Sequence, residues 1–315
     1  MPIIRLSKNW RKELKHQLRR DPSAQNIVWA AKGIAPLDKA TQFVTQNDPK
    51  AIIFLDLDDD DAGLAEAFAK RSLTNRLRLH PWRRTNPRRI RRSQHAIAQS
   101  ASGYTFSSNA LATVYPQSFQ PSSRIPHVRT STQQPLRKVS ANSATVKFGS
   151  FGTLRPHKGS GLLLELMRYD RNMTLVTFEN CGLGTPEPTD CNWVELESDT
   201  PLDVAYSHVD VSVIPITEGN SGAQFQLPAK LIDSLQWGTP VLATPTPAIE
   251  EIAEGAFTPL CSPMTAAHVA EQIRTLASSD DGRRGAARFS EVLTPQAAAR
   301  ELILLIDQAA NAGGT

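Results

Sequence analysis

The sequence is poor in cysteine and has no long apolar run. Its 315 residues include three cysteines, Cys181, Cys191 and Cys261, and none belongs to a C-x-x-C pair. Three thiols cannot all pair, so we expect free thiols in a reducing compartment. No apolar stretch approaches the roughly 20 residues of a membrane-spanning helix, and the N-terminus lacks the apolar core of a signal peptide. We therefore expect a soluble, cytoplasmic protein.

Common nucleotide and metal signatures are also missing. The sequence has neither a G-x-G-x-x-G fingerprint nor a Walker P-loop, which argues against a dinucleotide site or a P-loop NTPase. No pair among its seven histidines has metal-ligand spacing, and we assign no catalytic base. No repeat of fixed period is found. With 40% apolar residues, the chain has enough material for a core, and its length suggests about two domains.

Charge divides the chain into a basic and an acidic part. The net charge of +4 combines 24 Lys and Arg against 10 Asp and Glu in residues 1–138 with 11 against 21 in residues 139–315. The sign changes within residues 116–143, a stretch rich in Pro, Ser, Thr and Gln that we interpret as the connection between domains. We predict a basic domain over residues 1–138, suited to anionic partners, and a second domain over residues 139–315.

Short apolar runs alternate with helical patterns, most clearly in the second half. Strands are predicted at residues 26–31, 51–56, 103–106, 146–151, 173–178, 193–196, 209–214 and 240–244. Helices are predicted at residues 160–168, 201–207, 227–237 and 247–254, and from the N-cap Thr294 through Ile306. Strands that alternate with helices imply parallel pairing, so we predict an α/β fold with doubly wound sheets.

The segment GSFGTLRPHKGSG, residues 149–161, lies between a predicted strand and a predicted helix. Its glycines let the backbone approach a ligand closely, and the helix N-terminus presents unpaired N–H groups to an anion. Arg155, His157 and Lys158 add donors at the sheet edge where open α/β sheets bind ligands. The segment favours a phosphate site, with a βα turn that uses glycine only for its geometry as the alternative.

A second signal spans residues 209–252, where an apolar strand leads through Pro215 into a loop of small and polar residues. The helix that follows carries Lys230 and Asp233, three residues apart and hence on neighbouring faces. The loop suits phosphate binding by backbone N–H groups, and the carboxylate suits the hydroxyl groups of a ribose. Together the two segments indicate a nucleotide site.

These segments resemble the retaining nucleotide-sugar glycosyltransferases of the glycosyl transferases group 1 family. F-G-T-L-R-P-H-K-G is similar to that family's glycine turn. D-V-S-V-I-P, followed by S-G-A-Q-F-Q-L-P-A-K-L-I-D-S-L-Q-W-G-T-P-V-L-A-T, is similar to its strand, loop, helix and strand. The resemblance covers most of residues 146–260. It implies an α/β fold of GT-B type, with two Rossmann-like domains whose parallel sheets face a cleft, and here a shortened N-terminal domain.

The resemblance also implies a donor site in the C-terminal domain. Lys158 and Arg155 would hold the diphosphate, and Glu218 would take the role of the family's first carboxylate. Asp233 would hold the ribose, although it is shorter than the usual Glu, and Thr153 stands where the family has Arg. The positions expected to contact the nucleotide are Gly152, Thr153, Val194, Glu195, Leu196, Ser221, Gly222, Lys230 and Asp233.

The implied activity is transfer of a sugar from a nucleotide-diphosphate donor to a cell-envelope or polysaccharide acceptor, with retention of configuration. Cations and fixed N–H dipoles would stabilise the charge on the leaving diphosphate, so neither a metal nor another cofactor is expected. The leaving phosphate would accept the proton of the acceptor. The alternative is a non-catalytic, degenerate sugar-nucleotide-binding or scaffold protein of the same fold.

In the N-terminal half, Asp56, Asp58 and Asp59 follow a predicted strand in the run DLDDDD. The run is compatible with a divalent metal that holds a sugar nucleotide, as in the D-x-D of the GT-A fold, and with a solvated turn at a strand end. The resemblance gives a third interpretation, since some family members have D-l-D-D at the cleft. It implies that Asp58 and Asp59 lie on the acceptor side.

Arginines crowd between Arg76 and Arg92, in RLRLHPWRRTNPRRIRR, with Trp82 among them. Three interpretations stay open: a solvated basic helix, a contact with an anionic membrane or lipid-linked acceptor, and nucleic-acid binding. An enzyme that extends a lipid-linked glycan fits the second better than the third, with peripheral contact at the inner face of the membrane. The expected partners are therefore a nucleotide sugar and a glycan or lipid-linked acceptor.

Overall fold

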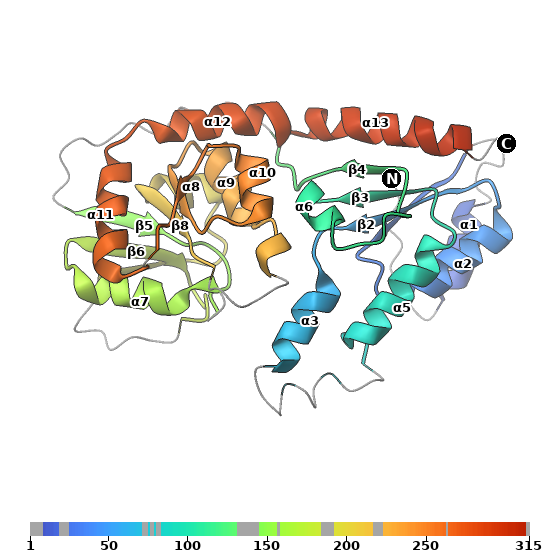
Figure 1. Cartoon of the computed structure of the whole chain (residues 1–315), viewed down its shortest axis with the longest axis horizontal. Helices are drawn as coiled ribbons and strands as arrows, with labels where there is room; N and C mark the ends of the chain where they lie inside the picture. Colours follow the sequence, from blue (N-terminus) through green and yellow to red (C-terminus); the bar gives the residue numbers. More distant parts are fainter. Residues whose placement is uncertain are drawn as a thin grey trace. The chain divides into compact units, whose positions relative to one another are not determined.

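The chain forms two compact α/β units (Figure 1). The structure is a computed structural model that describes residues 9–18, 25–70, 75, 79, 83–130, 145–155, 158–183, 192–216, 223–262 and 264–312. Unit 1 comprises residues 1–126 and 299–315, and unit 2 comprises residues 127–298. The division differs from the expected one at residue 138, because residues 127–138 belong to unit 2 and the C-terminal segment belongs to unit 1.

Unit 1 contains a parallel sheet of four strands, in the order β1-β2-β3-β4, within its described residues. The strands are β1 (Ile27–Ala31), β2 (Ile52–Leu57), β3 (Gly103–Phe106) and β4 (Ser122–Arg124). The helices are α1 (Trp10–Leu18), α2 (Leu37–Asn47), α3 (Asp61–Lys70), α5 (Pro87–Ala98), α6 (Asn109–Ala112) and most of α13 (Pro295–Ala312). Strand β4 lies inside the stretch that the sequence assigned to the interdomain connection, so that assignment was wrong at this point.

Strand β2 is apolar along most of its length because helices cover both of its faces. Successive side chains of a strand point to opposite faces of the sheet. Ile52 and Phe54 accordingly pack against Leu305 of α13, whereas Ile53 packs against Leu14 of α1 and Val44 of α2. Burial on both faces explains why the strand reads as a continuous apolar run rather than as an alternating pattern.

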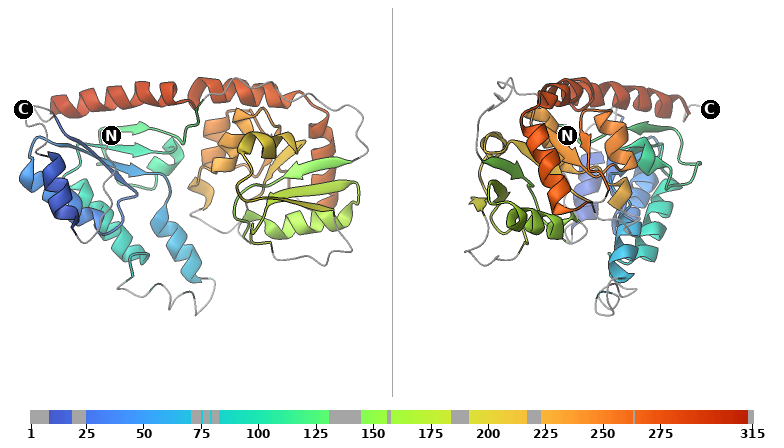
Figure 2. Two further views of the ribbon diagram at one scale, coloured as in Figure 1. Left: turned by 180° about the vertical axis from the view of Figure 1, so that it is seen from behind. Right: turned by 60° about the vertical axis from the view of Figure 1, so that its left-hand side comes forward.

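Unit 2 contains a parallel sheet of six strands, in the order β10-β9-β8-β5-β6-β7. The strands are β5 (Val146–Gly149), β6 (Met173–Phe178), β7 (Trp193–Leu196), β8 (Val211–Ile214), β9 (Val241–Ala243) and β10 (Thr258–Pro259). The helices are α7 (Ser160–Tyr169), α8 (Leu202–Ser207), α9 (Ala229–Gln236), α10 (Pro247–Ala253), α11 (Ala266–Ala277) and α12 (Asp281–Val292). Helices α7 and α11 pack on one face, whereas α9, α10 and α12 pack on the other (Figure 2).

The strand order of unit 2 fixes where a ligand is expected. The chain builds β5, β6 and β7 outward in one direction and then returns to the other side of β5 to build β8, β9 and β10. The order therefore reverses between β5 and β8. Open α/β sheets bind ligands at such a reversal, beyond the carboxyl ends of the strands.

The local patterns predicted most of the strands and the main helices of unit 2 around the site. Strands β3, β6 and β7 match the predicted ranges, and the ends of the other predicted strands differ by no more than two residues. The start of α13 is also confirmed, because Thr294 Oγ1 accepts a hydrogen bond from Ala297 N at 3.3 Å. No ranges were predicted for strands β4 and β10 or for helices α1, α2, α3, α5, α6, α11 and α12. Within the described ranges, none of the helices combines the length and the hydropathy that a bilayer crossing demands.

Candidate functional site

The glycine turn after β5 is held at both ends by buried side chains. Phe151 packs edge-on against Tyr206, with 4.8 Å between the ring centroids. Leu154 is buried, and its N–H donates to Cys181 O at 2.6 Å. Gly152, between these anchors, is exposed and has φ +98°, with open space where a Cβ would be. Backbone conformation rather than crowding therefore requires glycine here, and the turn presents Gly152 and Thr153 to solvent.

A second glycine brings helix α7 close to strand β8. Gly159 precedes α7 with φ +68°, and a Cβ on it would lie 2.4 Å from Pro215 Cβ, directly after β8. Only glycine allows this approach, so the unpaired N–H groups of the α7 N-terminus lie at the strand-order reversal. Lys158 is partly buried in the turn before the helix, and its N–H donates to Arg155 O at 2.8 Å. Arg155 itself is exposed.

Helix α9 carries a second lysine to the same edge of the sheet. Lys230 Nζ donates to Ser150 Oγ at 3.1 Å, and Ser150 is fully buried at the carboxyl end of β5. Burial, and after it the charge of Lys158, lower the pKa of Lys230 to about 7. The two predicted lysines, Lys158 and Lys230, are thus brought together beside the α7 N-terminus, an arrangement suited to a multiply charged anion.

Asp233, the predicted ribose ligand, lies one turn after Lys230 but is engaged within unit 2. Its side chain is 10% exposed, and its Oδ1 accepts a hydrogen bond from Arg129 Nε at 2.7 Å. Burial raises the pKa of Asp233, against the opposing effect of the Arg129 guanidinium. The ribose role stays a prediction, and a ribose hydroxyl would share this carboxylate with Arg129.

A network of buried hydroxyl groups holds the backbone of Lys230 in position. The Tyr206 hydroxyl donates to Lys230 O at 3.2 Å, and the Ser234 hydroxyl lies 2.5 Å from the same carbonyl oxygen. Ser234 also bonds to Ser212 of β8 at 2.7 Å between the two Oγ atoms. These bonds fix the first turn of α9 against the sheet and so hold Lys230 in place.

The remaining predicted donor residues are spread along the sheet. Val194 and Glu195 are exposed on the edge strand β7, and Leu196 packs against the cluster that contains Phe151. Strand β7 is two strands from β5, which corresponds to about 10 Å across the sheet. The predicted positions Glu218, Ser221 and Gly222 lie outside the described residues, and their roles stay predictions.

In unit 1 the aspartates after β2 surround a lysine. Lys32 Nζ lies 2.7 Å from Asp58 Oδ1, 3.3 Å from Asp59 Oδ2 and 3.7 Å from Asp61 Oδ1. Burial opposes the charge on Lys32, but the hydrogen bond to Asp58 and the nearby carboxylates outweigh burial and raise the pKa of Lys32. Burial, with the charges of Asp59 and Asp58, raises the pKa of Asp61 to about 6 despite Lys32.

The contacts of Lys32 bear on the metal-site interpretation of the aspartate run after β2. Within the described residues, no group of His, Cys, Asp and Glu has the arrangement of a metal site. The ammonium of Lys32 lies where a divalent ion would be expected, and Asp56 Oδ1 accepts a hydrogen bond from Thr105 Oγ1 at 2.7 Å. The acceptor-side role of Asp58 and Asp59 stays a prediction.

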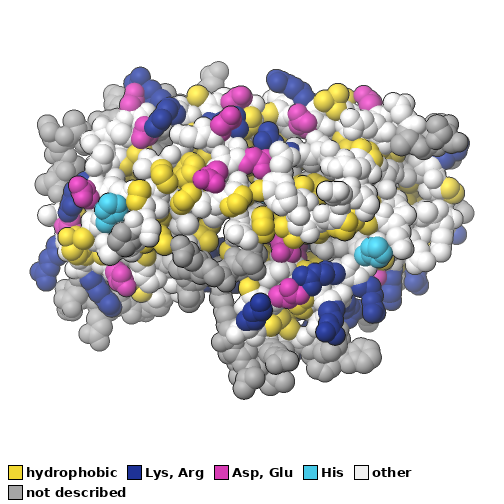
Figure 3. Space-filling model, in the orientation of Figure 1, with side chains coloured by type: hydrophobic (Ala, Val, Ile, Leu, Met, Phe, Trp, Pro, Cys, Tyr) yellow, Lys and Arg dark blue, Asp and Glu magenta, His cyan; other side chains and the backbone are white. Residues whose placement is uncertain are grey.

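Unit 1 also presents a basic surface on α5. Lys and Arg side chains gather over this helix at the lower right of Figure 3. Asn86 caps the helix by accepting from Arg88 N at 3.1 Å, and Ile90 and Ile97 face the core. Arg88 and Arg92 are exposed, whereas Arg91 is paired with Glu66. Arg76, Arg78 and Trp82 of the predicted cluster lie outside the described residues.

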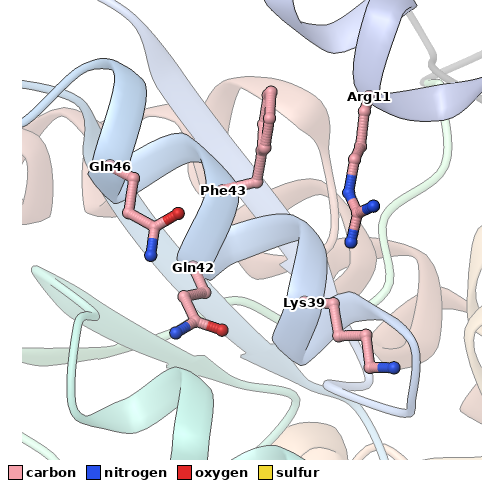
Figure 4. A pocket seen from close by; sticks show the side chains of 5 residues that line it. All are labelled: Arg11, Lys39, Gln42, Phe43 and Gln46. Atoms are coloured by element: carbon pink, nitrogen blue, oxygen red, sulfur yellow. The ribbon is translucent and has the colours of Figure 1, made fainter.

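A second basic feature is an open pocket of about 450 Å³ between α1 and α2. Figure 4 shows Arg11 extending from α1 toward α2. Lys39, Gln42, Phe43 and Gln46 of α2 line the same opening. The lining combines two cations with two amide groups and an aromatic ring, and no carboxylate is among these residues. Such a lining suits an anionic, hydroxyl-rich group.

Three residues at these sites, Lys32, Ser150 and Arg129, were not predicted from the sequence. Lys32 was detectable in principle, because Lys32 and Gly33 directly follow a predicted strand as the glycine turn follows β5, and both have positive φ. Arg129 gave no local signal, since its partner Asp233 lies 104 residues away. Ser150 was inside the glycine turn, but a buried serine that accepts from a lysine has no signature in sequence.

No family model and no curated protein matches the sequence. Solved structures do match. The sucrose-phosphate synthase of Thermosynechococcus elongatus superposes with a TM-score of 0.64 at 15% identity, over 96% of this chain and 78% of that chain. HepE of Anabaena, in complex with UDP and glucose, gives 0.56 at 14% identity, over 99% and 83%. The lipopolysaccharide outer core galactosyltransferase WaaB gives 0.57 at 12% identity, over 96% and 81%.

At these identities the likeness establishes the fold. The chain has the α/β fold of the GT-B glycosyltransferase structures, with two parallel sheets, and it spans about four fifths of the length of the three chains just compared. The predicted fold class is confirmed.

Proposed function

We propose that this protein is a glycosyltransferase that uses a nucleotide-diphosphate sugar as donor. The observation that carries the proposal is the pair of lysines, Lys158 and Lys230, beside the N-terminus of α7 at the reversal of strand order. Two cations and a helix N-terminus match a diphosphate better than a neutral metabolite or a single carboxylate. The fold neighbour HepE, whose structure contains UDP and glucose, supports the same assignment.

The arrangement fits the electrostatics of glycosyl transfer. As the bond between the sugar and the diphosphate breaks, negative charge grows on the leaving phosphate and the sugar becomes oxocarbenium-like. Lys158, Lys230 and the α7 N–H groups are fixed in place before the reaction, so they stabilise that charge without reorganisation. We propose that the reaction retains configuration, with the leaving phosphate accepting the proton of the acceptor hydroxyl, and that it needs no metal.

For the acceptor we propose a cell-envelope or polysaccharide glycan. WaaB, a fold neighbour, is by name a lipopolysaccharide galactosyltransferase. The exposed arginines of α5 and the pocket of Arg11 and Lys39 suit an anionic or lipid-linked acceptor and peripheral contact with an anionic membrane at its cytoplasmic face. Nucleic acid is not the proposed partner.

The decisive test is calorimetric titration with UDP, GDP and ADP without metal, on the wild type, Lys158→Ala and the control Arg88→Ala. Binding of one diphosphate that is strongly weakened or lost in Lys158→Ala and kept in Arg88→Ala supports the donor site and identifies the base. If none of the three binds, the proposal is wrong. Retention is tested by NMR assignment of the anomeric configuration of the product formed from the corresponding nucleotide sugar.

A further inference from the structure

Lys230 is held at the donor edge of unit 2 by a neutral group. Its Nζ donates to the Ser150 hydroxyl at 3.1 Å, and the serine is fully buried. Within the described part of the chain, no aspartate or glutamate forms an ion pair with Lys230. A partly buried ammonium without a carboxylate partner is costly, because burial favours the uncharged amine.

The charged groups around Lys230 do not compensate for this burial. Lys158, from the turn before α7, carries the same charge and adds to the penalty. Asp233 lies on the same helix, but its carboxylate is bonded to Arg129 at 2.7 Å. The negative charge closest along the helix is therefore already balanced by a guanidinium.

Among the residues that the structure describes, the remaining titratable neighbours do not supply negative charge either. His127 contributes to lowering the pKa of Asp233, and Tyr206 of α8 donates its hydroxyl to Lys230 O. Burial, together with the charge of Asp233, raises the pKa of Tyr206, so the phenol stays neutral. Near pH 7, where the pKa of Lys230 lies, the charged and uncharged forms of this lysine are both well populated.

We propose that the diphosphate of a nucleotide binds at the Lys158 and Lys230 pair together with one proton, which Lys230 takes from solvent and returns when the nucleoside diphosphate leaves. The inference deepens the proposed function and rests on that donor site. No covalent bond to the ligand forms. The free amine gains a proton, the anion compensates the repulsion between the two ammonium groups, and the full positive charge of the site is present only when the ligand is bound.

Proton uptake is measured by calorimetry at pH 7 in two buffers of different ionisation enthalpy, MOPS and Tris. The titrants are UDP-glucose, GDP-mannose and ADP-glucose, whose esterified phosphates do not titrate near neutral pH. Uptake of about half a proton is expected for the nucleotide sugar that binds, because about half of the free protein carries Lys230 uncharged. By the same linkage, the affinity falls about 30-fold between pH 6 and pH 8.5.

Three variants test the assignment to Lys230. Lys230→Arg keeps the charge but does not titrate in this range, so it binds without proton uptake and without the pH dependence. Lys158→Ala removes the like charge, which raises the pKa of Lys230 and reduces the uptake at pH 7, while the affinity falls. Lys147→Met, an exposed lysine on the same strand β5, leaves uptake and affinity unchanged.

The outcomes separate the two claims. Binding with the same enthalpy in both buffers and a flat pH profile overturns the proton coupling and leaves the donor site standing. Uptake that persists in Lys230→Arg assigns the proton to another group and also overturns the coupling. Failure of every nucleotide sugar to bind at any pH from 6 to 8.5 overturns the donor site and the coupling together.

Discussion

The two units differ in the charges that surround a lysine at the edge of the sheet. In each, a lysine lies at the carboxyl edge of a parallel sheet beside a turn with positive φ. In unit 1, Lys32 faces three carboxylates, and its pKa is raised. In unit 2, Lys230 faces a hydroxyl and a second lysine, and its pKa is lowered. The first lysine is a structural ion-pair partner, whereas the second leaves positive potential available for a ligand.

The largest effect is expected when the environment of Lys230 is converted into that of Lys32. In Ser150→Asp, the new carboxylate pairs with Lys230, raises its pKa and neutralises the site that a diphosphate would use. We expect nucleotide-sugar affinity to fall by about 10- to 100-fold and its pH dependence to disappear. Calorimetry measures both, and Ser150→Asn, of similar size without charge, controls for packing. Equal losses in the two variants would show that crowding, not charge, is responsible.

The next largest effect concerns Lys32. Lys32→Met removes the common partner of Asp58, Asp59 and Asp61 and leaves three carboxylates in mutual repulsion. We expect the free energy of unfolding of unit 1 to fall by about 1–2 kcal/mol, discounted because the lysine side chain is 38% exposed. Hydrogen exchange in peptides of α3 measures the loss. Lys50→Met, an exposed lysine of the same unit, is the control, and nucleotide affinity is expected not to change.

A smaller effect of opposite sign is expected at Lys230. Its folded pKa of about 7 lies below the ordinary lysine value of 10.5, so between these pH values the unfolded chain binds more protons and stability rises with pH. Lys230→Met removes this dependence. It should stabilise α9 at pH 6, where the lysine is charged when folded, although loss of the Ser150 hydrogen bond offsets part of the gain, and the gain should shrink steadily as the pH rises toward 10. Hydrogen exchange of α9 peptides across this pH range checks the sign.

The smallest effect is expected at Asp61. Its folded pKa of about 6 lies above the ordinary aspartate value of 3.8, so the folded protein binds more protons between these values, and stability falls as the pH rises through them. Asp61→Asn should therefore stabilise unit 1 at pH 7 by about 0.5 kcal/mol, because loss of the Lys32 contact offsets part of the relief. At pH 3.5 the benefit should be absent. A variant less stable at pH 7 than at pH 3.5, relative to the wild type, would contradict the assignment.

Local sequence patterns were sufficient to predict most of the strands of unit 2, the helices around its site and its glycine turns. They were not sufficient to predict which charged side chains contact one another. Gly159 was identifiable because the glycine-rich segment 149–161 lies between a predicted strand and a predicted helix. The Lys32 cluster depends on the parallel register of β1 and β2, in which Ala31 pairs with Asp56 and so brings the next residue, Lys32, to the aspartate run. The contact between Lys32 and the aspartates can be predicted only once the pairing of β1 with β2 is known. The bond from Arg129 to Asp233 depends on the folding of a whole unit.

The same limit explains the error at β4. Its three residues, Ser122–Arg124, carry no apolar alternation, and the strand forms because β3 offers it an open edge. Strand propensity depends strongly on such tertiary context. The polar composition that suggested a connection between domains was therefore compatible with a short edge strand.

The C-terminal helix has a consequence for how the protein is made. Leu305 and Ala309 of α13 complete the core around Ile52 and Phe54, and Ser123 bonds to Glu301 at 3.2 Å. A ribosome delivers these late residues only after all of residues 127–298 has been synthesised. The half that is translated first must therefore wait for the last helix, while unit 2, which is continuous in sequence, can close its core earlier. Folding order along the nascent chain should thus run opposite to the order of synthesis.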